Sequence, residues 1–193
     1  MNVFYVDKNP TIAAQCLVNS HCVKMILESA QLLSTAHRVL DGKLTVEKKV
    51  VNGSLPIRHR NVKRWVLNDD RESALYSATH VNHPSAIWSR ASDLNYNWLY
   101  EMWCHLLDEY TYRYGKVHAC ARLRETLKSI PKNISTGFFT DPTPAMPDEC
   151  KIAGNSLASY HKYYLEKKNH FAKWTKRQPP IWYIDAIDNN ANI

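Results

Sequence analysis

The chain has 193 residues and a formal net charge of +7, with 45% hydrophobic and 22% charged residues. This composition excludes a disordered chain, and the length allows one domain with a proper hydrophobic core. The low count of 5 glycines disfavours a turn-rich all-β fold, and no window has the roughly 20 apolar residues of a membrane-spanning helix.

The N-terminal part is predicted to form a short strand followed by a long helix. Residues 3–6 are a short apolar run, which is typical of a strand. Asn9 and Pro10 then indicate a helix start, because asparagine caps a helix N-terminus and proline is tolerated in the first turn. The helical pattern continues to Leu40, with or without a break near residues 19–20.

Residues 43–64 differ in character from this helix. Apolar and charged residues alternate there, and Asn52-Gly53 is a turn signal, which allows a small hairpin. Gly42, directly before this segment, is expected to end the helix in a left-handed conformation.

The second half of the chain is predicted to be helical, with helices over 69–78, 92–114, 119–130 and 156–176. Gly115 and Pro131 end the second and third of these, and residues 131–149 form a long loop rich in proline. We therefore expect a mainly α fold. It is a single compact helical domain over residues 1–183, with a short N-terminal strand and room for a small hairpin, and a flexible C-terminal tail over residues 184–193.

The cysteines and histidines do not predict a metal site. The five cysteines form no C-x-x-C motif, and their odd number favours reduced thiols in a cytoplasmic protein. The N-terminus lacks the features of a secretory signal. His80 and His83 form an H-x-x-H unit that could bind zinc, but a structural role for each is favoured because no H-E-x-x-H accompanies them. We predict neither a metal nor a cofactor.

A line of polar residues on the first long helix is the main functional signal. Its members are spaced alternately three and four residues apart, so they lie on one helical face: His21, Lys24, Glu28, Gln31, Thr35 and Arg38. A solvated face is the alternative interpretation. Because nearly all other positions of this helix are apolar or small, we favour a partly enclosed site in which the central Glu28 acts as a general base or an electrostatic stabiliser.

Two basic segments suit a polyanionic partner. The first contains Arg58, Arg60, Lys63 and Arg64, and the second interleaves basic and aromatic residues over Lys173, Lys176, Arg177, Trp182 and Tyr183. Basic side chains bind phosphates and aromatic rings stack on bases. Ordinary solvated surfaces with buried aromatic residues remain the alternative.

Three stretches resemble one known family. They are Cys16 to Leu33, Ser77 to Val81, and a set near the end that includes Met146 to Glu149, Asn155 to Ser159 and Pro180 to Tyr183. Together they are similar to the phage pyrimidine-dimer DNA glycosylases, the endonuclease V family, which are small, basic, helical proteins that excise a damaged base. The string from His21 to Glu28 also resembles one in phage proteins without an assigned function.

The resemblance implies that Glu28 is the catalytic carboxylate and His21 the site histidine. The chain departs from the family at Leu27 and Gln31, where the family has arginine. It departs further at Asn2, because the family uses the α-amino group of a small second residue as nucleophile. Asn2 disfavours removal of the initiator methionine, and the predicted strand separates it from the helix. Simple hydrolysis is therefore expected rather than an imine-forming lyase step.

The sequence thus favours a DNA glycosylase-type hydrolase acting on double-stranded DNA in the cytoplasm, that of the host cell if the protein is phage-encoded. Glu28 and His21 are the expected catalytic residues. Those expected to bind substrate are Lys24, Gln31, Arg38, His80, His83, Arg90 and Asn95. The alternatives are a hydrolase or transferase acting on a free nucleotide or nucleoside, and a non-catalytic nucleic-acid-binding protein. The oligomeric state is not predicted.

Overall fold

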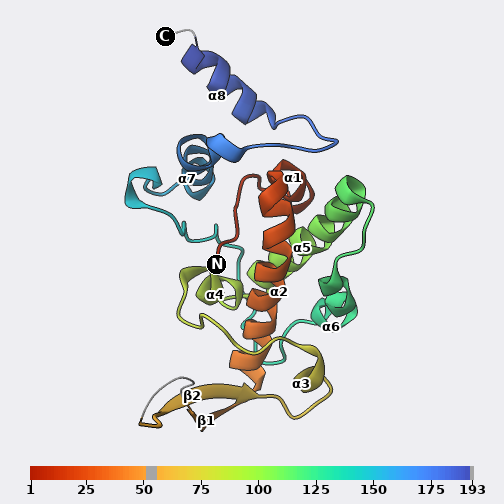
Figure 1. The fold of residues 1–193 in the computed structure, drawn as a ribbon, viewed down its shortest axis with the longest axis vertical. Helices are drawn as coiled ribbons and strands as arrows, with labels where there is room; N and C mark the ends of the chain where they lie inside the picture. The colour runs from red at the N-terminus through yellow and green to blue at the C-terminus, as the bar shows by residue number, and fades with distance from the viewer. Residues whose placement is uncertain (51–55, 192–193) are drawn as a thin grey trace.

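Two long helices form the centre of the molecule (Figure 1). The computed structural model describes residues 1–50 and 56–191. The fold is mainly α, as predicted, and its elements are α1 (Pro10–Cys16), α2 (Asn19–Asp41), β1 (Lys43–Val50), β2 (His59–Val66), α3 (Arg71–Ala74), α4 (Pro84–Ser89), α5 (Asp93–Tyr114), α6 (Arg124–Lys128), α7 (Ser156–Tyr163) and α8 (Ile181–Ala191). Short 3-10 turns lie at Ala119–Leu123, Asp148–Cys150 and Asn169–Phe171.

Local capping explains why α5 matches its prediction at both ends. The Ser92 side chain accepts a hydrogen bond from the backbone N–H of Asn95, and Gly115 ends the helix with a φ of 65°. The indole of Trp103 donates to the Ile26 carbonyl over 3.0 Å, which ties α5 to α2 through the core. The helix that carries Glu28 therefore has a rigid support behind it.

The predicted long N-terminal helix is divided into α1 and α2 by two extended residues, Leu17 and Val18. Asn9 caps α1, as expected. The prediction for Gly42 is wrong, because its φ is −88°. Glycine is needed there for space: a Cβ atom would lie 2.5 Å from the Arg38 carbonyl oxygen.

The predicted N-terminal strand is also wrong. Val3 to Val6 form an irregular, buried segment rather than a strand. It packs against α7, where the Phe4 ring lies 6.0 Å from that of Tyr160 and His161 contacts the Val6 carbonyl oxygen over 2.8 Å. The apolar run that indicated a strand serves instead to bury this segment in the core.

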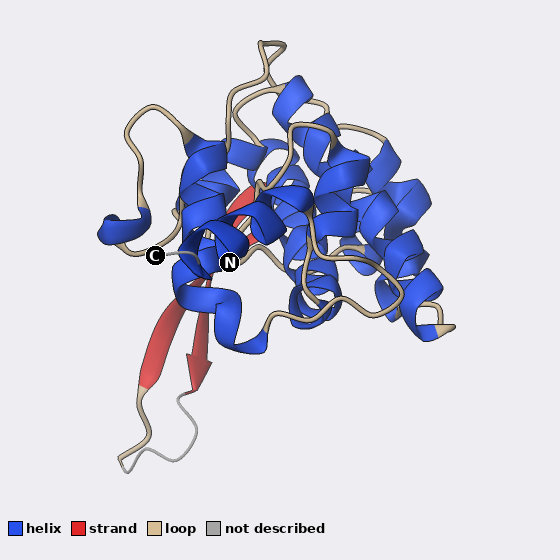
Figure 2. Ribbon diagram, turned by 90° about the horizontal axis from the view of Figure 1, so that it is seen from above, coloured by secondary structure: helices blue, strands red, loops and turns tan. Residues whose placement is uncertain are grey.

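The predicted hairpin is confirmed, with β1 and β2 paired antiparallel from Lys43↔Val66 to Val50↔His59. Its predicted turn, Asn52-Gly53, lies outside the described residues. The hairpin projects away from the helices in both ribbon views (Figures 1 and 2). Its strands are exposed over most of their length.

The C-terminal region differs from the prediction in two respects. The helix expected over 156–176 continues past α7 only through a π-helical turn, Tyr164–Lys168, and a 3-10 turn that ends at Phe171. Where a loose tail was expected from residue 184, α8 extends to Ala191. None of the described helices is long and apolar enough to cross a membrane.

Candidate active site

A pocket of about 220 Å³ lies between the N-terminal segment, α2 and the end of α7. It is lined by three of the predicted residues, His21, Lys24 and Glu28, and also by Met1, Asn2, Phe4, Met25, Ala145, Tyr163 and Lys168. The first three residues of the polar line, His21 to Glu28, therefore face a concave site rather than bulk solvent. Cationic groups outnumber the single carboxylate in this lining, which favours an anionic ligand.

Glu28 is held in this pocket by groups that stabilise a carboxylate. Its side chain is 15% exposed, and Oε2 accepts a hydrogen bond from the Asn2 backbone N–H over 3.1 Å. The Lys24 Nζ atom lies 3.3 Å from Oε1, and the Met1 amino nitrogen lies 3.7 Å from Oε2. The N-terminal segment thus reaches the helix, whereas the sequence predicted that a strand would separate them.

The Asn2 side chain anchors this arrangement. Its Oδ1 atom accepts hydrogen bonds from the Val3 N–H and the Tyr160 hydroxyl over 2.8 and 2.6 Å. Its Nδ2 atom donates to the Ala145 carbonyl over 2.8 Å. Because Asn2 is buried and its amide is bonded to α7 and to the proline-rich loop, its backbone N–H is fixed beside Glu28.

His21 forms the aromatic floor of the pocket and is neutral. Its Nδ1 atom lies 2.7 Å from the Tyr164 hydroxyl, and its ring lies 4.1 Å from that of Phe4. Burial lowers the pKa of His21 to about 3, with a further contribution from the positive charges of Lys168 and Lys24. At neutral pH His21 is therefore a hydrogen-bonding imidazole and not a cationic acid.

Aromatic rings and a cation also line the pocket. The Phe4 and Tyr163 rings are parallel, with centroids 6.1 Å apart, and the Lys168 ammonium lies 4.7 Å from the Tyr163 centroid. Phe4 has a φ of 55°, which is unfavourable for a side chain of this size. The surrounding contacts hold this strained residue, which is 5% exposed and packs against the rings of His21 and Tyr163.

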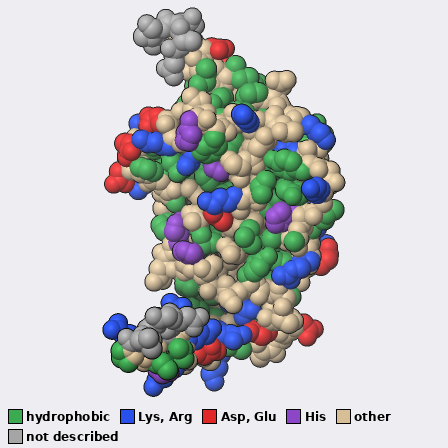
Figure 3. Space-filling view, viewed as in Figure 1, with side chains coloured by type: hydrophobic (Ala, Val, Ile, Leu, Met, Phe, Trp, Pro, Cys, Tyr) green, Lys and Arg blue, Asp and Glu red, His purple; other side chains and the backbone are tan. Residues whose placement is uncertain are grey.

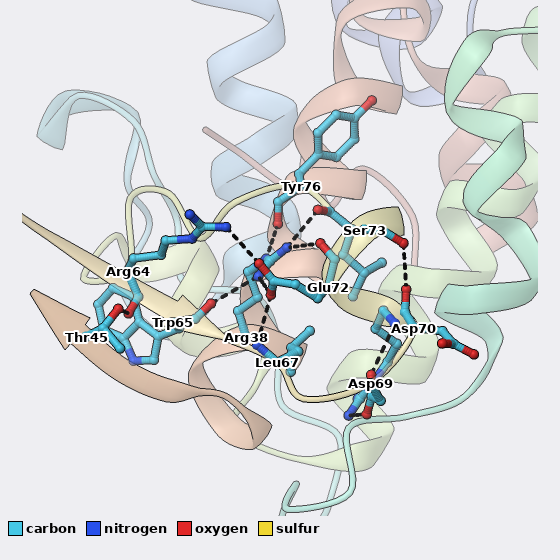
Figure 4. Close-up of polar contacts among 12 residues, drawn as sticks. Arg38, Thr45, Arg64, Trp65, Leu67, Asp69, Asp70, Glu72, Ser73 and Tyr76 are labelled. Atoms are coloured by element: carbon cyan, nitrogen blue, oxygen red, sulfur yellow. Dashed lines mark hydrogen bonds and ion pairs between the residues drawn. The ribbon is translucent and has the colours of Figure 1, made fainter. Parts of the chain in front are cut away.

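The last two residues of the polar line, Thr35 and Arg38, have a structural role. Arg38 is 3% exposed and donates from all three guanidinium nitrogens to Glu72 and to the carbonyls of Trp65, Glu72, Leu75 and Tyr76 (Figure 4). Thr35 is fully buried and bonds to the backbone of Thr79. Arg38 thus lies inside the fold and not at the pocket. It joins the base of the hairpin to α2.

The other predicted substrate-binding residues do not line the pocket. Asn95 is fully buried and its amide holds Thr140 and the Trp88 carbonyl, which is a structural role. Arg90 ends α4 and donates to the Ala86 carbonyl. Gln31 lies one turn beyond Glu28 and is partly buried.

His80 and His83 flank the loop before α4, and His83 caps this helix. Burial lowers the pKa of His83, followed by the positive charges of the N-terminus and His80, whereas Glu28 raises it. His83 is therefore within electrostatic reach of the pocket without lining it. Among residues 1–50 and 56–191, no three His, Cys, Asp or Glu side chains are grouped closely enough to bind a metal.

The C-terminal basic segment is largely held against the protein by contacts of its own. Arg177 forms hydrogen-bonded ion pairs with Glu109, which also binds Arg113, and the Lys176 ammonium donates to the Tyr112 carbonyl. Trp182 stacks on His161 with ring centroids 4.0 Å apart, Tyr183 is 8% exposed, and the Lys173 side chain is exposed. Most of the C-terminal segment is therefore docked onto the protein itself.

The hairpin segment presents its charges outward. Arg58, Arg60, Lys63 and Arg64 are exposed on or beside β2, and Arg64 pairs with Glu47 and Glu72. Basic side chains gather over this end of the molecule in the space-filling view (Figure 3). A second pocket, of about 230 Å³, lies where the hairpin meets the body, and Arg64, Lys63 and Arg38 contribute to its lining.

Sequence reasoning missed the contributions of Asn2, Phe4, Tyr163 and Lys168. For Asn2 and Phe4 no local signal exists, because their role depends on the chain returning from α7 to cover them. Tyr163 and Lys168 lie in the helix predicted over 156–176, just before the basic and aromatic segment that begins at Lys173. No protein-family model, curated protein or solved structure matches the chain.

Proposed function

We propose that the chain is a DNA glycosylase-type hydrolase that cleaves the N-glycosidic bond of a damaged or modified base, with Glu28 as the key carboxylate. The observation that carries this proposal is the position of Glu28, which is almost buried yet borders a pocket lined by cationic and aromatic groups. Breaking a glycosidic bond builds positive charge on the sugar, and a fixed carboxylate stabilises that charge.

The pocket is small, which suits a single base rather than a larger ligand. Its volume of about 220 Å³ is below the roughly 300–1,000 Å³ of sites that enclose a drug-sized ligand. Enzymes that act on a base in duplex DNA rotate that nucleotide out of the stack and hold it against aromatic side chains. Tyr163, which is half-buried at the pocket, offers such a surface. Lys24 and Lys168 supply positive charge for flanking phosphates.

The chemistry assigned to Glu28 is hydrolysis. Its carboxylate takes a proton from water, the water oxygen bonds to the anomeric carbon of the sugar, and the bond to the base nitrogen breaks with its electron pair leaving on the base. Neutral His21 orients the water or the sugar through hydrogen bonds, because its lowered pKa keeps it from being the proton donor at neutral pH.

The test is release of free bases from a panel of duplex oligonucleotides that each carry one damaged or modified base. We expect release from at least one substrate by the unmodified chain, and a loss of about 100-fold or more for Glu28→Gln with an unchanged melting temperature. Glu101→Gln, an exposed carboxylate on α5, is the matched control and should be fully active. Full activity of Glu28→Gln would refute the assignment.

Two further readouts separate the chemical alternatives. Reduction with borohydride during turnover traps a protein–DNA adduct only if an amine, such as the Met1 amino group 3.7 Å from Glu28, attacks the sugar. Cleavage of free nucleosides with little dependence on salt would instead assign the same pocket to monomeric substrates. Duplex-dependent release without a trapped adduct is the result expected for the proposed hydrolase.

A further inference from the structure

Nearly all the excess positive charge of the chain lies in the hairpin region. Residues 43–66 contain seven Lys and Arg residues and one Glu, a net charge of +6, whereas the whole chain has 25 basic and 18 acidic residues and a net charge of +7. The other residues therefore contain 18 basic and 17 acidic side chains and are almost neutral. The net attraction of the chain to a polyanion is consequently concentrated in this element.

The hairpin has the form of a free ribbon with charge on both faces. Register and alternation place Lys48 and Lys63 on one face and Lys43, Lys49 and Arg60 on the other. Each strand has eight residues, which corresponds to a length of roughly 26 Å. The ribbon projects from the helical body (Figure 2). All five of these basic side chains are exposed, so a partner can contact them.

One pair of like charges across the two strands destabilises the hairpin in the unbound protein. Lys49 and Arg60 are direct partners in the antiparallel register. Like charges that face each other across two strands destabilise the pairing by about 0.2–1 kcal/mol. An anion that binds both side chains removes this repulsion, so the arrangement favours the bound state of the hairpin over the free one.

We propose that the hairpin β1–β2 docks as a ribbon in the major groove of duplex DNA and is the main element by which the chain holds its substrate. The major groove is about 12 Å wide and admits a two-stranded ribbon, and its phosphates flank the ribbon on both sides. The major groove of duplex RNA is deep and narrow and does not admit such a ribbon. This inference rests on the proposed function, because it names how the enzyme holds its DNA.

The base of the ribbon is fixed relative to the pocket. Arg38 binds the Trp65 carbonyl at the end of β2 and also binds Glu72, whose other carboxylate oxygen accepts from Arg64 (Figure 4). Arg38 lies ten residues after Glu28 on the same helix, a separation of roughly 15 Å along its axis. DNA held by the ribbon is therefore held at a defined distance from the carboxylate.

The test measures binding to an undamaged duplex over a series of salt concentrations. The double variant Lys49→Gln/Arg60→Gln should bind about tenfold more weakly at low salt and lower the slope of log affinity against log salt by about 2. Its melting temperature should not fall, because a repulsive pair has been removed. The control Lys116→Gln/Lys128→Gln removes two exposed charges of the body and should bind like the unmodified chain. Equal losses in both double variants would overturn the proposal.

Other nucleic acids and the chemistry are tested in the same format. Binding to duplex RNA of the same sequence that is as tight as binding to duplex DNA would overturn docking in the major groove. Glu28→Gln should bind undamaged DNA normally, since no chemistry is involved. If no base is released while the hairpin variant still binds DNA more weakly, the glycosylase proposal is refuted and the proposal that the hairpin binds DNA is supported. If bases are released and the hairpin variant binds DNA normally, the proposal that the hairpin binds DNA is refuted instead.

Discussion

At the scale of single residues, the surroundings of Glu28 depend on a residue far away in the sequence. The Asn2 side chain fixes the Asn2 backbone N–H, which donates a hydrogen bond to Glu28. The Asn2 amide bonds to Tyr160, Ala145 and the following backbone, and this holds the Asn2 N–H on Glu28. Neither the spacing of the polar line nor its composition contains this information. The line indicates Glu28 as the candidate carboxylate, and the N-terminal segment encloses it.

Replacement of Asn2 tests this anchoring. Asn2→Ala leaves the Ala145 carbonyl and the Tyr160 hydroxyl without their partner, so we expect a loss of about 2–4 kcal/mol in the free energy of unfolding. Base release should fall at least about tenfold even where the variant is fully folded, because the N–H beside Glu28 is no longer fixed. Urea unfolding and single-turnover assays measure the two effects. Activity equal to that of the unmodified chain would show that Asn2 is only structural.

A buried histidine predicts how stability depends on pH. The Arg71 guanidinium can only donate, so His37 accepts at Nδ1 and donates from Nε2 to the Tyr96 hydroxyl. Burial lowers the pKa of His37 to about 4, and the positive charge of Arg71 adds to this shift. The unfolded chain, with an ordinary histidine pKa of about 6.5, therefore binds a proton that the folded chain resists.

The free energy of unfolding should accordingly fall as the pH is lowered from about 6.5 towards 4. The His37 contribution to this loss is on the order of 3 kcal/mol. His37→Gln retains one acceptor and one donor but does not titrate, so its stability should change less between pH 7 and pH 4. Chemical denaturation at several pH values provides the measurement. Parallel curves for the two proteins would contradict a neutral His37.

At the scale of elements, the sequence predicts best what local chemistry determines. Helix α5 begins and ends where Ser92 and Gly115 indicate, and the hairpin lies where the alternation indicates. The predicted strand at residues 3–6 failed because a buried irregular segment has the same apolar composition as a strand. The helix expected to reach residue 176 ends at Phe171, since the chain leaves it through a π-helical and a 3-10 turn.

The candidate site was predictable in part for the same reason. Spacing along one helix placed His21, Lys24 and Glu28 together, and all three line the pocket. Spacing alone could not show that Arg38, on the same line, is covered by α3 and the hairpin. A buried arginine that binds carbonyls and a phosphate-binding arginine are indistinguishable in the sequence, because the difference lies in what packs over them.

The Arg38 network should be the most sensitive contact between the hairpin and the body. Arg38→Met keeps the apolar stem but leaves Glu72 and several buried carbonyls without a donor, so we expect a loss of about 3–5 kcal/mol in the free energy of unfolding. Lysine cannot replace the planar guanidinium, so Arg38→Lys should recover only a minor part of this loss. Equilibrium unfolding in urea provides the comparison. A loss below about 1 kcal/mol for Arg38→Met would show that the hairpin is held by other contacts.

At the scale of the whole molecule, the two proposed roles, chemistry and DNA binding, depend on two different parts of α2. The upper part of α2 carries the carboxylate and the pocket, and its lower part holds the charged hairpin through Arg38. The body is nearly neutral overall, so most of the net charge proposed to hold DNA lies apart from the carboxylate proposed to act on it. Binding and chemistry should therefore respond to different substitutions.

The most direct test of the central claim needs no knowledge of the natural lesion. Duplexes are prepared with a neutral tetrahydrofuran abasic site or with a cationic pyrrolidine in its place, which mimics the charge of the sugar in the transition state. If Glu28 stabilises that charge, the chain should bind the pyrrolidine duplex about 100-fold more tightly, and Glu28→Gln should abolish the difference. Equal affinity of the unmodified chain for both duplexes would contradict the account.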